Sequence, residues 1–175
     1  MKSAAFVAVG ILLLLVQGNL YRVLGPSGVH GATPNLVLPL VIFLGVHEAS
    51  MARGALLAAG LGYALDLFAS APIGLFTFVS VAVWWLSRVA GVRLTAQTAL
   101  TRMSLGFGFS LVESAIILTL LAIFGSDTKR PVEVGSIVFP HAISTALCAP
   151  FVFKLAQRLY QGGTSVHASQ EATAP

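Results

Sequence analysis

The side chains best suited to chemistry in this chain are two acids that stand alone within apolar stretches. Asp66 lies in the segment from Arg53 to Leu75, and Glu113 lies in the run from Met103 to Phe124. A charge at the centre of a membrane costs about 3 kcal/mol on insertion scales, so a buried acid there is a functional hypothesis by default. Asp66 has two interpretations: a structural acid that binds loop amides or caps the helix near Pro72, and a group that recognises a partner.

Glu113 is expected either to pair with a basic residue of the same chain or to contact a partner protein. On a helical wheel it shares a face with Arg102, Gly106 and Ser110, which combines polar and small side chains. Further along, His141 follows a proline and is expected to donate to a carbonyl that the proline leaves free.

The sequence lacks the combinations of residues that catalysis requires. His47 and Glu48 begin like a zinc-protease motif, but the fourth residue after His47 is Met51 and not a second histidine. The GPSG at 25–28 resembles a nucleophile turn, yet no general base is predicted within its reach. A phosphate-binding loop and a carboxylate cluster for magnesium are both missing, and the single cysteine, Cys148, excludes a multi-cysteine metal site. We therefore expect no catalytic residue, no metal and no cofactor.

Composition places the chain among the integral membrane proteins. Of its 175 residues, 57% are hydrophobic and 9% are charged, far below the quarter that is typical of soluble domains. A helix needs about 20 apolar residues to cross the hydrocarbon core, so the length allows about six spans and no extramembrane enzyme domain. The net charge of +4 comes from basic residues scattered singly between apolar runs. This pattern sets orientation in the lipid bilayer and does not predict nucleic-acid binding.

We predict an all-α membrane protein with six transmembrane helices in one domain, residues 1–160, followed by a disordered cytoplasmic tail, 161–175. The second apolar run, Leu36 to Val46, covers only about half the hydrocarbon thickness. It either continues to Met51 or forms a re-entrant segment covered by protein. The adjacent Trp84 and Trp85 near the end of the fourth helix indicate an interfacial aromatic belt.

A helical wheel predicts which face of the third helix meets protein. One side carries Leu57, Leu61, Ala64 and Phe68, and the other carries small residues together with Asp66. Lipid gives no hydrophobic drive to helix association, so small residues mark where helix backbones approach one another. With Glu113 on the fifth helix, the residues expected to bind a partner or fix helix register are Ala55, Ala59, Gly62 and Asp66.

Two corners are predicted to frame this helix. Arg53 and Gly54 form a tight turn from the second helix into the third. Ser70 caps the fourth helix, and Pro72 lies in its first turn, where the missing amide hydrogen costs nothing. Gly74 belongs to the same corner.

The distribution of Lys and Arg over the short loops predicts the orientation, because cytoplasmic loops carry an excess of these residues. With six spans, both termini are expected in the cytoplasm. The predicted outer side holds Arg22, Lys129 and Arg130. The predicted cytoplasmic side holds the larger set, Lys2, Arg53, Arg88, Arg93, Arg102, Lys154 and Arg158.

The stretch from Asn35 to Val92 combines several of these features. Pro34-Asn35 leads into a short apolar helix, Arg53-Gly54 follows, and the small-residue helix with Asp66 ends at the corner of residues 70–75. This combination resembles the MreD family of bacterial rod-shape-determining membrane proteins. The family often carries an acid where this chain has asparagine after the proline.

The resemblance implies a non-enzymatic scaffold of cell elongation in the bacterial cytoplasmic (inner) membrane, which maintains cell shape. Such a scaffold binds MreC, a single-span protein with a periplasmic coiled coil, and a homodimer is a further option. Through MreC it would link the MreB filament to peptidoglycan synthesis by a RodA-type polymerase and its transpeptidase partner.

The family is also similar in fold to the substrate-binding subunits of energy-coupling factor transporters. The rival hypothesis is therefore a transporter subunit that binds a small ligand in a pocket near the outer face, built from Tyr21, His30 or Asp66. A third hypothesis is a lipid-modifying enzyme. The absence of the residue combinations that bind a catalytic metal or activate a nucleophile opposes it.

Overall fold

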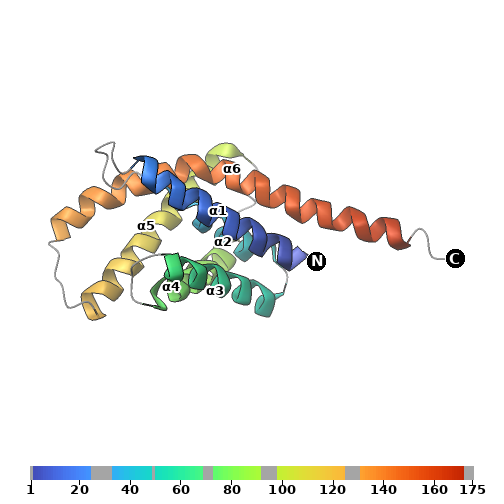
Figure 1. The fold of residues 1–175 in the computed structure, drawn as a ribbon, viewed down its shortest axis with the longest axis horizontal. Helices are drawn as coiled ribbons and strands as arrows, with labels where there is room; N and C mark the ends of the chain where they lie inside the picture. Colours follow the sequence, from blue (N-terminus) through green and yellow to red (C-terminus); the bar gives the residue numbers. More distant parts are fainter. Residues whose placement is uncertain are drawn as a thin grey trace.

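The computed structural model describes the backbone over residues 2–24, 33–48, 50–68, 73–91, 98–124 and 131–171. These residues are all-helical, without a strand among them (Figure 1). The helices are α1 (Lys2–Leu24), α2 (Val37–His47), α3 (Met51–Phe68), α4 (Leu75–Gly91), α5 (Ala99–Phe124) and α6 (Pro131–Glu171).

Three helices in the described ranges are long and apolar enough to cross a membrane. Their apolar parts are Met51–Phe68 in α3, Ala99–Ile123 in α5 and Ile137–Tyr160 in α6. The other three helices contain shorter apolar stretches, Ala4–Leu20, Val37–His47 and Leu75–Ala90. The prediction of an all-helical chain is thus confirmed, and its long helices are compatible with a membrane protein.

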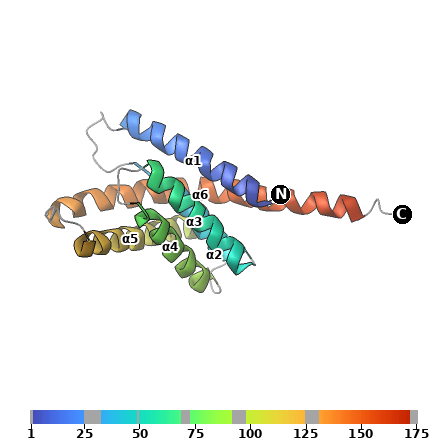
Figure 2. The same cartoon turned by 60° about the horizontal axis from the view of Figure 1, so that its bottom comes forward.

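The short helix α2 forms the centre of the core, in contact with α1, α3, α4, α5 and α6. Around it, α3 lies beside α4 and α5 lies beside α6 (Figure 2). All nine residues from Val37 to Gly45 are buried. Pro39 lies in the first turn, where a missing amide hydrogen removes no intrahelical bond. Glu48 has an extended backbone, with φ −80° and ψ 117°, so α2 ends at His47 and does not continue to Met51 as one helix.

Glycines let α3 and α4 approach closely. A Cβ added at Gly62 would lie 2.6 Å from the carbonyl oxygen of Phe76, and one added at Gly54 would lie 2.8 Å from Trp84 Nε1. Trp84 is accordingly a core residue, 3% exposed, and only its neighbour Trp85 has an exposed ring. Trp84 therefore lies at the interface of α3 and α4, and of the two tryptophans expected in an aromatic belt only Trp85 is exposed.

The buried face of α3 is rotated by about a quarter turn from the predicted one. Leu57 and Leu61, expected on the side of α3 that faces away from protein, are buried, whereas Ala55 and Ala59 are only partly buried. A Cβ added at Gly10 of α1 would overlap the Leu61 side chain. The reason for the rotation is that α3 packs its leucines against α1 and α2 as well as its glycines against α4.

The corner residues are only partly where the sequence suggests. Arg53 and Gly54, expected in a turn, lie instead in the first helical turn of α3, and the chain reverses before Met51. Gly74 lies in the turn that precedes α4. The predicted roles of Ser70 and Pro72 fall outside the described residues.

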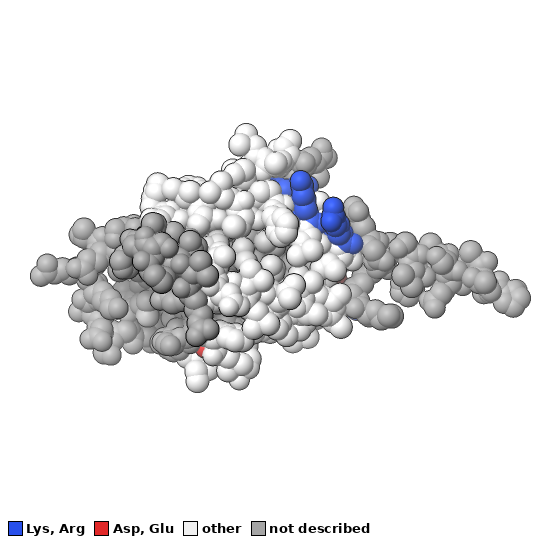
Figure 3. Space-filling view, turned by 45° about the horizontal axis from the view of Figure 1, so that its top comes forward, with Lys and Arg blue, Asp and Glu red and all other residues white. Residues whose placement is uncertain are grey.

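One end of the bundle carries basic side chains, and we call it the basic end (Figure 3). Arg88 Nη1 donates to the carbonyl oxygen of Glu48 at 2.7 Å, and Arg102 Nη2 donates to Gln157 Oε1 at 3.2 Å. The first contact joins the ends of α2 and α4, and the second joins the start of α5 to α6. The ring of His47 at the end of α2 contacts that of Tyr160 on α6, with 6.2 Å between the ring centroids, so all four helices meet at this end. Asp66, 13 residues after Arg53 on α3, lies about 20 Å further along that helix, toward the other end.

The last helix is longer than composition predicts. Its backbone is helical through Pro140 and Pro150 and on to Glu171, although the polar sequence from 161 predicts a disordered tail. Extending an existing helix needs no new nucleus, and composition alone does not include this effect.

Candidate functional site

Asp66 holds the start of α4. The residue is 4% exposed, and its carboxylate accepts four hydrogen bonds. The donors are the N–H groups of Gly74 (3.0 Å), Phe76 (2.9 Å) and Thr77 (3.1 Å), and the hydroxyl of Thr77 (2.6 Å). The first amides of a helix have no partner inside it, and the helix dipole favours a negative charge there. Asp66 is therefore a cap supplied by a neighbouring helix, which matches its structural interpretation.

Gly74 shapes the turn that brings these amides to Asp66. Its φ of +97° lies in the left-handed region, which is open to glycine and strained for other residues. No atom lies within 4 Å of a Cβ built there, so backbone conformation and not space explains the glycine.

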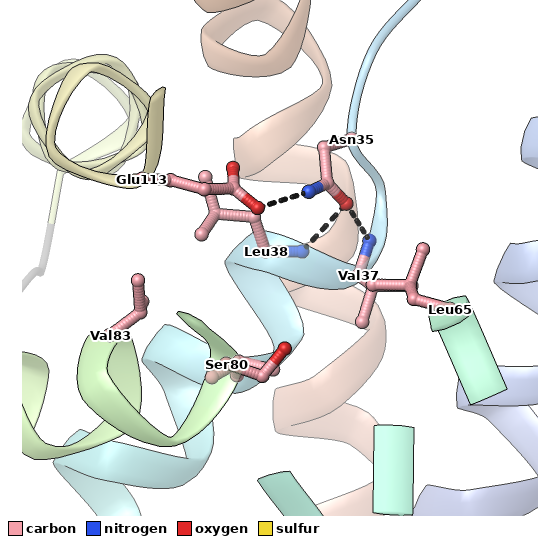
Figure 4. Close-up of a pocket in the computed structure, with 8 residues that line it drawn as sticks. Asn35, Val37, Leu38, Leu65, Ser80, Val83 and Glu113 are labelled. Carbon is pink, nitrogen blue, oxygen red and sulfur yellow. Dashed lines mark hydrogen bonds between the residues drawn. The ribbon is translucent and has the colours of Figure 1, made fainter. Parts of the chain in front are cut away.

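A second polar group, which we call the polar plug, lies at the start of α2. It consists of Gln17 of α1, Asn35, Glu113 of α5, and His141 and Thr145 of α6. Asn35 Oδ1 accepts the N–H groups of Val37 at 3.1 Å and Leu38 at 3.2 Å, in the manner of a helix N-cap. Its Nδ2 donates to Glu113 Oε1 at 2.7 Å, so one amide side chain joins α2 to α5 (Figure 4).

The plug also satisfies the backbone that leads into α2. His141 Nδ1 donates to the carbonyl oxygen of Thr33 at 2.7 Å. The N–H of Asn35 donates to Thr145 Oγ1 at 3.0 Å, and the N–H of Leu36 donates to Gln17 Oε1 at 3.1 Å. An unsatisfied backbone group in hydrocarbon costs several kcal/mol, so these side chains allow a non-helical segment to be buried.

Glu113 differs from the rest of the plug because half of its carboxyl group has no partner. The residue is 5% exposed, and among the described residues no donor reaches its Oε2. Ser110, one turn earlier on the same helix, is fully buried, and its hydroxyl likewise has no partner there. Buried polar atoms without a partner are rare in native proteins, so this pair calls for a physical explanation.

A narrow pocket borders Glu113 (Figure 4). It is lined by Asn35, Val37, Leu38, Val41, Leu65, Ser80, Val83 and Glu113. The space between these side chains is too small to hold a water molecule, so no small ligand fits it as the side chains are placed.

The structure brings together only some of the predicted site residues. Gly62 and Asp66 both face α4, and Glu113 meets Asn35 and not a basic residue. Gln17 is not among the predicted site residues, although an amide near the end of an otherwise apolar helix is a signal that could have marked it. For the rival transporter hypothesis, the side chains of Tyr21 and His30 lie outside the described residues.

Acid–base or metal chemistry would need further groups beside these acids. Within the described ranges, no three His, Cys, Asp or Glu side chains come together in a way that could hold a metal ion.

The chain was also compared with known proteins. No family model, no curated protein and no solved structure matches it.

Proposed function

We propose that this chain is a non-enzymatic scaffold of the MreD type, which spans the bacterial cytoplasmic membrane six times with both termini inside. In this arrangement α1 and α4 cross beside the three longer helices, as in the substrate-binding subunits of energy-coupling factor transporters. The 11 residues of α2 cover only about half the hydrocarbon thickness, so α2 crosses together with the non-helical segment 33–36 that precedes it. The scaffold binds MreC and so links MreB filaments to the RodA-type polymerase and its transpeptidase. The basic end supports this orientation, because Lys and Arg are enriched on the cytoplasmic side.

The observation that carries the proposal is a bare face of α5. Small residues recur along its exposed side within an arc of about 60° on the helical wheel. They are Ser104, Gly108, Ala115, Thr119 and Ala122. A Cβ built at Gly108 meets no atom within 4 Å. Small residues let two membrane helices pack backbone to backbone, so this face suits the single span of MreC.

The opposite face of α5 is already occupied. A Cβ added at Gly106 would lie 2.7 Å from Ala149 Cβ of α6, and Ser110 and Glu113 on the same side are buried. Gly62 of α3 is likewise covered by α4. The partner contact expected at Gly62 and Glu113 is therefore better placed on the bare face of α5.

A pair of matched glycine substitutions tests this assignment. Gly108→Leu adds bulk to the bare face of α5, and Gly60→Leu adds the same bulk to an exposed position of α3 that also has no neighbour within 4 Å. We expect Gly108→Leu to reduce the MreC recovered from native membranes at least about tenfold, which corresponds to about 1.4 kcal/mol. Gly60→Leu should retain MreC. Equal recovery with both variants would contradict the proposal.

A further inference from the structure

The carboxyl group of Glu113 is buried with one neutral polar partner and, among the described residues, no positively charged one. Within the part of the chain that the structure describes, its one hydrogen-bond partner is the neutral amide of Asn35, whose Nδ2 donates to Oε1 at 2.7 Å. Oε2 has no donor among the described residues. An ionised carboxylate buried in this way loses its hydration and gains almost nothing in return, whereas a neutral carboxyl group loses far less.

Among the described residues, no charged side chain of the surrounding helices is bonded to Glu113. On α5, Arg102 is 11 residues before Glu113, about 16 Å along the helix, and it donates to Gln157. On α4, Arg88 donates to the carbonyl oxygen of Glu48, beyond the end of α2. His141 on α6 is bonded to the Thr33 carbonyl, Asp66 on α3 is bonded to α4, and His47 lies at the far end of α2. Lys154 and Arg158 follow Thr145 on α6 by 9 and 13 residues, about 14 and 20 Å along the helix, and Arg53 precedes Asp66 on α3 by about 20 Å.

A metal cation is not a suitable occupant of this position. The neighbouring pocket has no room for a water molecule, and a sodium or potassium ion needs several oxygen ligands around it. The side chains that line the pocket beside Asn35 and Glu113 are one serine and apolar residues. A proton is the only ligand that both fits and removes the charge.

We propose that Glu113 is a proton-binding site, which takes a proton from water, holds it at neutral pH and thereby keeps the polar plug closed between α2 and α5. The bound proton converts the carboxylate into a carboxylic acid, whose carbonyl oxygen still accepts from Asn35. Rotation of either side chain would let the new O–H donate to the Ser110 hydroxyl, which lies one turn earlier on the same helix and has no partner among the described residues. Release of the proton leaves an uncompensated charge in the plug and favours its opening to water.

Infrared difference spectroscopy tests the proton directly. The spectrum of the wild type at neutral pH is compared with those of Glu113→Gln and Asp66→Asn, with each full-length protein in detergent. We expect a C=O stretching band of a neutral carboxylic acid that disappears in Glu113→Gln and stays in Asp66→Asn. A wild type without this band, or a band that survives in Glu113→Gln, would overturn the proposal. Failure of Glu113→Gln to fold would do so too, because the amide has the shape of the neutral acid.

The pH dependence of unfolding separates a proton from a metal cation. A group that binds more protons in the folded state than in the unfolded state makes stability fall as pH rises, by up to tenfold in the unfolding equilibrium constant per pH unit. We expect this fall for the wild type from mildly acidic to mildly alkaline pH, and a smaller one for Glu113→Gln. Identical slopes for the two proteins would contradict the proposal. Stabilisation of the wild type by sodium chloride, but not by choline chloride, would show a cation site and overturn it as well.

Discussion

Asp66 and Glu113 are acids of similar burial in apolar helices, yet their surroundings are opposite. Asp66 receives four donors, three of them amides at the start of a helix, where the dipole favours negative charge. Glu113 receives one donor from a neutral amide. The number and type of hydrogen-bond donors, and not burial, therefore distinguish these two acids. Asp66 works as a charged cap, and Glu113 is suited to hold a proton.

The largest effect should come from removing the cap. Asp66→Ala leaves four donors at the start of α4 without their acceptor, and we expect a loss of about 3 kcal/mol in the free energy of unfolding. Asp66→Asn keeps an acceptor oxygen but loses the charge, so it should lose about half as much. Denaturation in mixed micelles measures both. Equal stability of the wild type and Asp66→Ala would show that the cap does not hold α4.

A smaller effect should follow when the plug loses an acceptor. Thr145→Val removes the oxygen that accepts the N–H of Asn35 and keeps the shape of the side chain. We expect a loss of about 1.5 kcal/mol, because a buried amide is left without a partner. Thr145→Ser retains the hydroxyl and should stay much closer to the wild type in the same denaturation assay. If the serine variant lost as much as the valine variant, packing and not the hydrogen bond would be responsible.

The turn before α4 should respond by about 1 kcal/mol. Gly74→Ala forces a side chain into the left-handed region, which disfavours the turn that presents its amide to Asp66. Gly60→Ala on the exposed side of α3 is the control, since alanine there has open space and improves helix propensity. Melting temperatures in detergent should therefore move in opposite directions for the two variants. A parallel shift would contradict the role of the positive φ.

The smallest effect is expected for the acid that we consider neutral. Glu113→Gln replaces a carboxylic acid by an amide of the same shape, and we expect a change below about 1 kcal/mol at neutral pH. The same denaturation assay that ranks the Asp66 variants measures it. A loss as large as that of Asp66→Ala would erase the contrast between the two acids.

Local patterns predicted much of this architecture. The apolar runs indicated the membrane class and the approximate position of each helix, and the closeness of Asp66 to the corner before the fourth helix suggested a cap. These features depend on residues near one another in sequence. Even here the α2–α3 turn was misplaced, because Gly54 is required by its contact with Trp84 and not by a turn.

Contacts between distant segments could not be read in the same way. Asn35 and Glu113 are 78 residues apart, and no local pattern marks an asparagine as the partner of a glutamate. The wheel of α3 showed where its small residues lie but not that Leu57 and Leu61 pack inward, because that depends on which helices flank α3. The sequence does not show which helices pack against α5 either, so it could not predict which of its small-residue faces is covered and which is exposed.

The proposal that MreC contacts the exposed face of α5, and not that of α3, can be tested most directly by photocrosslinking in native membranes. A photoreactive amino acid is placed at Gly108 on the bare face of α5 or at Gly60 on α3, and the product is probed for MreC. We expect a crosslink to MreC from position 108 and none from position 60. A crosslink from position 60 alone, or none from position 108 while MreC still co-purifies, would contradict it.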